Sequence, residues 1–324
     1  MRKIRYADAL NEALIEEMAR DERVFVIGED VDLYGGVFKL TRHLVERFGP
    51  DRVVGTPISE EGFVGLAVGA AMTGLRPVVE IMYMDFIMLA MDQMVNQMAK
   101  LRYMSGGQFP MSVTIRAQAG AGTAEAAQHS QSLEAWFMHV PGIKVIMPAT
   151  VYDAKGLLKS AIRDNNPVVV IENRVLFYDF EEVPEGEWIV PLGKADIART
   201  GSDVTVVAMG YARRKALAAA EQLDGEISVE VIDPRTIQPL DLETIVASVR
   251  KTGRLLIVHE APTCCGVGAE IVRQVVAEAF HYLDAPPQVL GGADLPMPFS
   301  PPLEQACLPQ EATIVSAVRK LREG

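Results

Sequence analysis

Apolar residues in the first half of the chain follow two patterns, a helical spacing and short continuous runs. Over residues 7–20, Leu10, Leu14 and Met18 recur at every fourth position and predict a helix. Short apolar runs of strand length alternate with such helical patterns. The predicted strands cover 24–27, 77–82, 112–115, 143–147 and 167–172, and further predicted helices cover about 38–48, 59–73, 86–104 and 151–163. This alternation is typical of an α/β fold with a doubly wound parallel sheet, whose ligand sites lie at the carboxyl ends of the strands.

The alternation stops between residues 173 and 189. Residues 179–187 are acidic, contain Pro184 and Gly186, and predict an exposed linker. A second series then begins. Its predicted strands cover 203–208, 227–232, 254–258 and 287–290, and its predicted helices cover about 211–223, 241–252, 267–280 and 311–322. We therefore predict two α/β domains, residues 1–185 and residues 186–324.

Composition narrows the class of protein. The length of 324 residues favours two domains, and 49% hydrophobic with 23% charged residues is a globular composition. The mean hydropathy is slightly positive, which suggests that other subunits cover part of the surface. The net charge of −12, with the 31 Lys and Arg residues dispersed, disfavours nucleic acid as a partner.

Neither a signal sequence nor a membrane anchor is expected. The charged N-terminus is followed by no apolar core, and the most apolar helical stretch, residues 61–74, is too short and too rich in glycine to span a bilayer. The three cysteines, Cys264, Cys265 and Cys307, have neither the spacing of a zinc site nor that of a disulfide framework. We expect a soluble protein of the reducing cytoplasm.

The segment from Gly55 to Phe63 joins a short strand to an apolar helix. Ser59 is placed to cap that helix, and Glu60 falls in its first turn, where the helix dipole favours a carboxylate. An ordinary helix start explains both residues.

Histidine is the side chain most suited to proton transfer near neutral pH, and His129 is the strongest candidate among the five in the chain. It follows a loop of small residues, 117–127, through which a ligand can approach the backbone closely. A solvated loop histidine is an equally good reading. His259, at the predicted carboxyl end of a strand, is a second candidate. His43 and His281 lie in or at the end of predicted helices, and His139 closes a short predicted helix that runs through Trp136.

The chain has no recognisable device for binding phosphate. It contains neither a P-loop nor a Gly-x-Gly-x-x-Gly pattern after a strand, and it shows no nucleophile elbow and no Cys/His cluster suited to zinc. An enzyme acting alone on a phosphorylated cofactor is expected to show one.

Five short strings together resemble one family. They are residues 56–60 (TPISE), 103–107 (YMSGG), 126–131 (AAQHSQ), 153–157 (DAKGL) and 162–167 (IRDNNP). With them, residues 4–322 resemble the β subunit of the thiamine-diphosphate-dependent decarboxylase component of 2-oxo acid dehydrogenase complexes. The strings are most similar to pyruvate dehydrogenase, and acetoin dehydrogenase β subunits are similar at the same places.

The resemblance implies a transketolase-like pyrimidine-binding domain, then a transketolase C-terminal-type domain, in an α2β2 heterotetramer that works with a lipoyl-bearing acyltransferase core. In this family the α subunit binds the diphosphate through Mg²⁺, with a Gly-Asp-Gly…Asn motif. This chain contains no Gly-Asp dipeptide, so an α subunit would account for the missing phosphate device.

The implied reaction is the oxidative decarboxylation of pyruvate, with transfer of the acetyl group to lipoate. Acetoin or a branched-chain 2-oxo acid is an alternative substrate. A non-catalytic assembly subunit is an alternative of another class.

The resemblance also assigns site residues. Glu60 matches the catalytic glutamate that hydrogen-bonds N1′ of the cofactor's aminopyrimidine, and Glu29 matches an acidic position near the cofactor. Met82 and Phe86 match the positions that wall the pyrimidine ring, although core packing accounts for them equally well. His129 matches the active-site histidine, which would donate a proton to the sulfur that leaves the lipoyl disulfide.

The family further suggests a potassium site, which maps to Val113, Ala161, Ile162, Asp164 and Asn166. Only Asp164 and Asn166 offer the side-chain oxygens that hard cations prefer. The C-terminal cap of a helix explains these two residues equally well.

Overall fold

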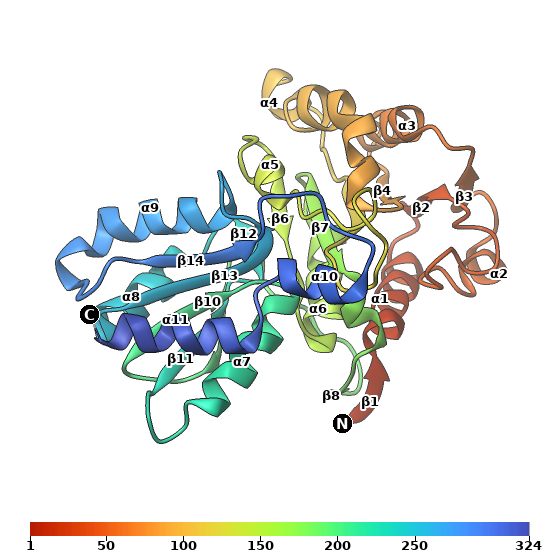
Figure 1. The fold of residues 1–324 in the computed structure, drawn as a ribbon. Helices are drawn as coiled ribbons and strands as arrows, with labels where there is room; N and C mark the ends of the chain where they lie inside the picture. Colours follow the sequence, from red (N-terminus) through yellow and green to blue (C-terminus); the bar gives the residue numbers. More distant parts are fainter. Residues whose placement is uncertain (324) are drawn as a thin grey trace. The chain divides into compact units, whose positions relative to one another are not determined.

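The computed structural model describes residues 1–323 (Figure 1). The chain forms two compact units, and each is described by itself. Unit 1 comprises Met1–Ala119 and Trp136–Leu192, and unit 2 comprises Gly120–Ala135 and the residues from Gly193 onward. Both are α/β structures, which confirms the predicted fold class. The family models described below leave residues 179–192 between them, and the boundary at residue 185 stays a prediction.

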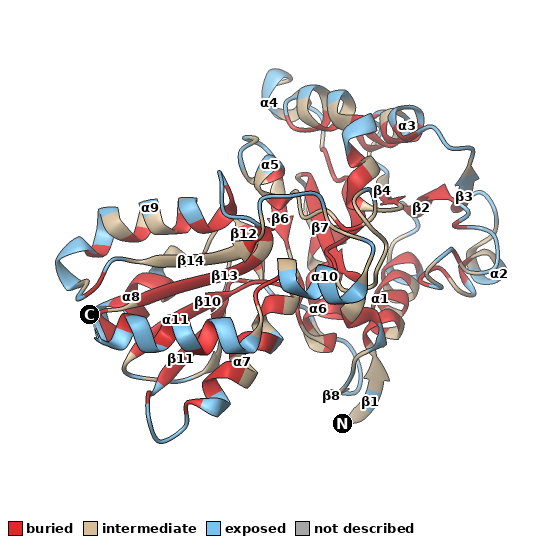
Figure 2. Ribbon diagram, in the orientation of Figure 1, coloured by how far each residue is buried: buried red, intermediate tan, exposed pale blue. Residues whose placement is uncertain are grey.

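Unit 1 is built on a parallel sheet with the strand order β6-β7-β5-β4-β2-β3. Both faces of this sheet are covered, and Figure 2 shows its strands largely buried, with the exception of β3, in which only Val53 is buried. Their bounds are β2 (Val24–Glu29), β3 (Val53–Thr56), β4 (Arg76–Ile81), β5 (Thr114–Ala119), β6 (Lys144–Ile146) and β7 (Val168–Asn173).

One long helix predicted over 86–104 is wrong. The segment forms a 3₁₀ helix (Met84–Ala90), a π-helix (Asp92–Met98) and the short α4 (Leu101–Met104). The spacing of the buried residues gives the reason. Met84, Ile87 and Ala90 are buried at intervals of three, which suits the tight 3₁₀ turn, whereas Met94 and Met98 follow at intervals of four.

The helix predicted over 38–48 is also largely wrong, since only α2 (Leu44–Phe48) forms. The side chain of Asn11, on α1 (Tyr6–Arg20), donates Nδ2–H bonds to the carbonyl oxygens of Leu40 (2.8 Å) and Arg42 (3.1 Å). These carbonyls therefore have partners without a helix. The remaining helices of this half are α3 (Glu60–Met72), α5 (Glu134–Met138) and α6 (Val151–Arg163).

The exposed linker predicted over 179–187 is in part a strand. β8 (Phe180–Val183) pairs antiparallel with β1 (Arg2–Arg5), so that Lys3 faces Glu182. Opposite charges that face each other across two strands stabilise the pairing. Because the segment has no apolar periodicity, its sequence pattern did not indicate a strand.

A buried ion triad crosses the middle of the unit 1 sheet. Arg116, on β5, is fully buried and donates to Glu172 on β7 (2.7 and 2.9 Å) and to Glu80 on β4 (2.8 Å). Burial and the neighbouring Glu80 raise the pKa of Glu172, while Arg116 opposes that rise. Because any slip in register would leave these charges buried without partners, the triad fixes the alignment of three strands.

Unit 2 has a five-stranded sheet with the order β14-β13-β10-β11-β9, in which only β9 is antiparallel. On β10, Val206 joins the apolar cluster of α7 and α11, whereas the Thr205 hydroxyl shares a hydrogen bond of 2.6 Å with Ser248 on α8. Alternate residues of β10 thus contact helices on opposite faces. The strands are β9 (Asp196–Arg199), β10 (Val204–Ala208), β11 (Val229–Asp233), β13 (Leu255–Pro262) and β14 (Gln288–Gly292), and a short β12 covers Thr236–Gln238. The helices are α7 (Tyr211–Gln222), α8 (Leu242–Thr252), α9 (Val267–Ala279), α10 (Pro301–Cys307) and α11 (Glu311–Glu323).

No helix within residues 1–323 is both long and apolar enough to cross a membrane.

Candidate active site

Four of the predicted site residues lie at one edge of the unit 1 sheet. Glu29 is the last residue of β2, and Thr56, its partner in the parallel register, ends β3. Glu60 opens α3 directly after β3, Met82 follows β4, and Phe86 lies in the 3₁₀ helix beyond it. The carboxyl ends of neighbouring parallel strands are where α/β sheets bind ligands.

Glu29 and Glu60 form an acidic pair at this edge. Both are buried, with 9% and 7% of their surface exposed. Burial raises the pKa of Glu29, and the nearby charges of Glu60 and Asp30 raise it further. The Oε1 atom of Glu29 has no hydrogen-bond partner within residues 1–323. A buried carboxyl oxygen without a partner is costly, and a ligand that donates a hydrogen bond would relieve that cost.

Ser59 stands at the N-cap position of α3, but its side chain makes no capping hydrogen bond, so the predicted cap is wrong. Its backbone instead has φ −168° and ψ 68°. Glu60 nevertheless lies in the first turn of the helix, where the dipole favours its negative charge.

An aromatic cluster lies beside Met82 and Phe86, both of which are half-buried. Tyr83 packs edge-to-face with Phe86, at 6.3 Å between ring centroids, and with Phe38 at 5.6 Å. The Arg174 guanidinium lies 4.8 Å from the Tyr83 ring centroid. Tyr83, with a left-handed φ of 69°, is a residue that the sequence patterns did not single out.

His129 belongs to unit 2, in the segment 120–135 that follows β5. Its loop is held by a buried carboxylate, because Glu304 on α10 accepts the backbone N–H groups of Gly122 (2.9 Å) and Ala124 (3.1 Å). Ala124 and Ala126 have left-handed φ angles of 56° and 63°, which alanine rarely adopts. Glu304 was not predicted, since it is about 175 positions from His129 and no local pattern links the two.

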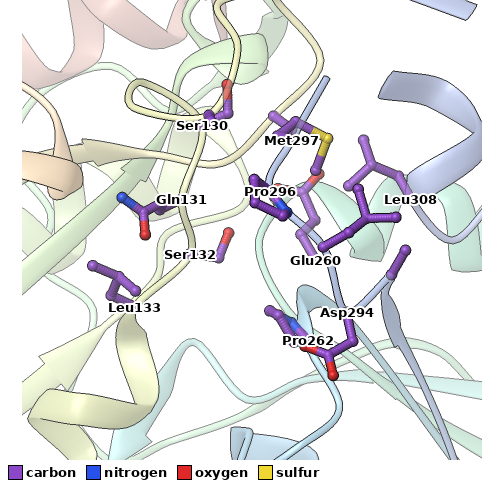
Figure 3. A pocket seen from close by; sticks show the side chains of 14 residues that line it. Ser130, Gln131, Ser132, Leu133, Glu260, Pro262, Asp294, Pro296, Met297 and Leu308 are labelled. Atoms are coloured by element: carbon purple, nitrogen blue, oxygen red, sulfur yellow. The ribbon is translucent and has the colours of Figure 1, made fainter. Parts of the chain in front are cut away.

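The loop residues after His129 line a cavity of about 370 Å³ (Figure 3). Residues 130–133 form one side of it, and Glu260 and residues 294–297 face them. The buried Ser130 hydroxyl has no hydrogen-bond partner among the described residues. Polar and apolar groups line this cavity in similar measure, and polar groups that can orient a ligand are a feature of small-molecule sites.

Glu134, the first residue of α5, is a titratable group that sequence reasoning missed. Burial raises its pKa to about 7. A hydrogen bond from its own backbone N–H opposes this rise, but its effect is smaller. A carboxyl group that titrates near neutrality is a feature of functional sites as well as of tightly packed cores.

His259 lies within β13 and is almost fully buried. Its Nδ1 lies 2.9 Å from the carbonyl oxygen of Ala261, and burial lowers its pKa. A side chain at Gly268 would come within 2.8 Å of its Nε2 atom, so this glycine is required by close packing. These contacts favour a packing role over the catalytic one considered for this histidine.

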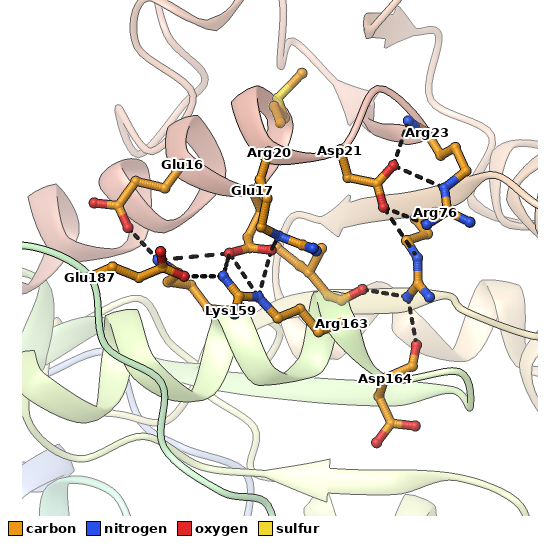
Figure 4. Close-up of polar contacts among 12 residues, drawn as sticks. Glu16, Glu17, Arg20, Asp21, Arg23, Arg76, Lys159, Arg163, Asp164 and Glu187 are labelled. Carbon is orange, nitrogen blue, oxygen red and sulfur yellow. Dashed lines mark hydrogen bonds and ion pairs between the residues drawn. The ribbon is translucent and has the colours of Figure 1, made fainter.

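The residues of the predicted potassium site surround the C-terminus of α6. Asp164 is the C-cap, and its Oδ1 accepts from the backbone N–H (2.9 Å) and the side chain (2.8 Å) of Asn166. Arg76 donates to the carbonyl oxygens of Ile162 (2.9 Å) and Asp164 (3.0 Å), as Figure 4 shows for Asp164. Val113 accepts the backbone N–H of Val168 (3.0 Å), and Ala161 accepts that of Asp164 (3.1 Å). Protein donors therefore already occupy one lone pair on most of these oxygens. In the described part of the chain, no group of three or more His, Cys, Asp and Glu side chains could hold a metal ion.

Comparison with known proteins first defines the class. The family model for the transketolase pyrimidine-binding domain matches residues 2–178, and that for the transketolase C-terminal domain matches residues 193–314. Together with the two α/β units and the acidic pair at a strand edge, these matches make the chain a transketolase-type protein. They confirm the predicted fold class and domain types.

The relatives then define the family. The chain is 50% identical over 314 residues to the pyruvate dehydrogenase E1 component subunit beta of Rhizobium meliloti, covering 96% of this chain and 68% of that protein. It is 49% identical to the same subunit of Rickettsia felis, covering 98% of both, and 46% identical to the mitochondrial subunit of Dictyostelium discoideum, covering 99% and 92%. The chain belongs to the family of pyruvate dehydrogenase E1 β subunits.

Solved structures agree with the fold. A split-gene transketolase, described as an inactive β4 tetramer, has a TM-score of 0.80 at 25% identity and covers 99% of this chain and 98% of that one. The transketolase of Leishmania mexicana has a TM-score of 0.73 at 18% identity, covering 100% and 46%.

Proposed function

We propose that this chain is the β subunit of the thiamine-diphosphate-dependent component that oxidatively decarboxylates pyruvate and transfers the acetyl group to a lipoyl-bearing acyltransferase. The single observation that carries the proposal is the buried pair Glu29 and Glu60 at the strand edge, where Glu29 lacks a hydrogen-bond partner within residues 1–323. It lies in a chain about half identical to curated pyruvate dehydrogenase β subunits over nearly its whole length.

Thiamine diphosphate, when bound, supplies the carbon nucleophile that attacks the 2-oxo group and holds the electron pair left by carbon dioxide. The residues of this chain would bind its pyrimidine. Glu60 would share a proton with N1′ of that ring, and its burial keeps water from competing for the bond. Glu29 would lie near the cofactor, and Met82 and Phe86 would wall the ring.

His129 would act at the second half of the reaction. We assign it the donation of a proton to the sulfur that leaves when the lipoyl disulfide is opened. The hydrogen bonds from Gly122 and Ala124 to Glu304 hold its loop in place, which supports this role, because a proton donor must lie within hydrogen-bond reach of its acceptor.

An α subunit completes the site in this proposal. The chain has no Gly-Asp dipeptide and no P-loop with which to bind a diphosphate. We therefore assign the diphosphate and its Mg²⁺ to the α subunit of an α2β2 heterotetramer, in the cytoplasm.

We also keep the potassium site as a proposal. A potassium ion would use the second lone pairs of the Val113, Ala161, Ile162 and Asp164 carbonyl oxygens, together with an oxygen of Asn166. Replacing K⁺ by Na⁺ at constant ionic strength should then lower the thermal unfolding midpoint of the chain. Equal midpoints in the two salts would remove the site from the proposal.

The catalytic assignment is tested by Glu60→Gln in the complex reconstituted with the α subunit. Loss of the carboxylate at N1′ should lower pyruvate decarboxylation by a hundredfold or more, since one preorganised catalytic group typically contributes about 10² to 10³. The matched control is Glu61→Gln, because Glu61 is the exposed neighbour in the same helical turn. Retained activity in Glu60→Gln would contradict the assignment and favour a non-catalytic assembly subunit.

The substrate is tested by a panel of pyruvate, 2-oxoisovalerate and acetoin, with thiamine diphosphate and Mg²⁺ present. The highest kcat/KM should be for pyruvate. A preference for either of the others would keep the mechanism and reassign the substrate.

A further inference from the structure

A second cavity, in unit 1, has no part in the reaction proposed above. It has a volume of about 230 Å³, and three arginines line it, Arg23, Arg76 and Arg102. Ser112 and Asn165 contribute the polar groups between them. Three arginines along one small cavity are unusual in a chain whose net charge is −12.

The positive charge of this cavity is only partly neutralised. Asp21 pairs with Arg23, at 2.9 Å to Nε and 2.7 Å to Nη2, and lies 3.7 Å from Nε of Arg76 (Figure 4). Arg102 donates Nη1–H to the carbonyl oxygen of Asn165 at 2.5 Å. Asp21 therefore serves two guanidinium groups, the charge of Asp164 also acts on Arg76, and Arg102 faces only a neutral carbonyl.

Arg76 is fixed in place before any ligand arrives. Its Nη1 donates to the carbonyl oxygens of Ile162 and Asp164, its Nη2 donates to Oδ1 of Asn165, and only 12% of its side chain is exposed. Burial lowers the pKa of Arg76, and the nearby charge of Arg23 lowers it further. A negative ligand in the cavity would offset both effects, because it would add to the counter-charge that Asp21 and Asp164 supply.

Donors remain for such a ligand. Among residues 1–323, the hydrogen bonds described leave Nη1 of Arg23, and Nε and Nη2 of Arg102, without a protein partner. The planar guanidinium fork suits the oxygens of phosphate, to which it binds through two parallel N–H···O bonds. Ser112, which is 95% buried, also lines this cavity and carries a hydroxyl group.

We propose that this cavity is a binding site for a phosphate group, either free orthophosphate or the phosphate of a small monoester, held by Arg102 and Arg23 over the fixed charge of Arg76. The volume admits a compact oxyanion such as phosphate. Asp21 accepts hydrogen bonds from Arg23 through both of its oxygens and so fixes the position of that guanidinium.

The test is binding of orthophosphate to the full chain, alone and assembled with its α subunit. Phosphorus-31 line broadening gives the affinity, and the thermal unfolding midpoint is followed with chloride at matched ionic strength. Arg102→Gln should weaken orthophosphate binding about tenfold or more, since hydrogen bonds between charged groups contribute roughly 1.5–3 kcal/mol. The affinity of Arg102→Lys for orthophosphate should lie between those of Arg102→Gln and the unchanged chain, because lysine keeps the positive charge but lacks the planar guanidinium group. Ser112→Ala provides a second variant should Arg102→Gln fold poorly, and it too should weaken binding.

The matched control is Arg47→Gln, at an exposed arginine of α2 in the same unit, which should bind as the unchanged chain does. Glycerol 3-phosphate in place of orthophosphate distinguishes the two sources. Equal affinity assigns the site to the phosphate of a monoester, and binding of orthophosphate alone assigns it to the free anion. No response beyond that to chloride, or an equal response in Arg102→Gln and Arg47→Gln, would overturn the proposal.

Discussion

At the scale of single residues, burial sets the acidity of the carboxyl groups that matter most. Glu29 and Glu134 have raised pKa values chiefly because their surroundings penalise the charged form. Asp21 shows the reverse, since hydrogen bonds from Arg23 hold its pKa down to about 2. These opposite shifts have opposite consequences for stability as the pH changes.

The first prediction concerns Glu134. Its pKa is about 7 when folded, whereas the ordinary value is 4.5. The folded state therefore binds more protons between these two values, so that stability is full below about pH 4.5 and falls as the pH rises to 7. The loss should reach roughly 3 kcal/mol, from 1.36 kcal/mol per pKa unit. Glu134→Gln should remove this decline and unfold at a higher temperature than the unchanged chain at pH 8.

The control for that measurement is Glu221→Gln, at an exposed position on α7. Thermal unfolding midpoints from pH 4 to pH 8 give the comparison. A constant difference between Glu134→Gln and the unchanged chain across this range would contradict the prediction.

For single residues, the sequence predicts the place of a side chain in the fold better than it predicts whether that side chain is buried. Glu29 and Glu60 could be placed at the carboxyl ends of strands because the apolar runs before them are clear. The importance of Glu134 and Glu304 could not be predicted, because their burial is produced by segments far apart in the chain.

At the scale of elements, the loop that carries His129 depends on a helix from the other end of the chain. Glu304→Ala should leave the N–H groups of Gly122 and Ala124 without acceptors, at a cost of about 1–3 kcal/mol for each buried group. We expect hydrogen exchange of residues 120–130 to become faster, and kcat of the reconstituted complex to fall while KM for pyruvate changes little.

Glu304→Gln separates positioning from packing, because it keeps the shape and one acceptor oxygen and should restore part of the protection. Glu278→Gln, at an exposed position on α9, serves as the control. Unchanged exchange in Glu304→Ala would show that the loop is held by other contacts.

Elements with a clear apolar period were predicted well, and the others were not. Most parallel strands of both units formed close to their predicted positions, whereas β5 runs from Thr114 to Ala119 and not over the predicted 112–115. The prediction for segment 84–104 was wrong because the spacing of its buried apolar residues changes from three to four partway along. Strand β8 was not predicted because charge pairing, and not apolar alternation, holds it to β1.

At the scale of the whole molecule, the proposed site is incomplete without a second chain. The chain alone should bind thiamine diphosphate at least a hundredfold more weakly than the reconstituted complex does, because it would contribute no contact to the diphosphate. Isothermal titration calorimetry in the presence of Mg²⁺ measures both affinities. Equal affinities would show that the chain has a diphosphate site that its sequence motifs do not reveal.

Unit 2 is discontinuous in sequence, since it includes residues 120–135, which lie between two parts of unit 1. A gene fusion that transplanted only the residues from Gly193 onward would carry the Glu304 carboxylate without its hydrogen-bond donors, the backbone N–H groups of Gly122 and Ala124. The C-terminal unit is therefore a poor module for domain shuffling. A fusion that keeps the histidine segment together with α10 therefore has to retain everything from Gly120 to Cys307, which is more than half of the chain and includes part of unit 1.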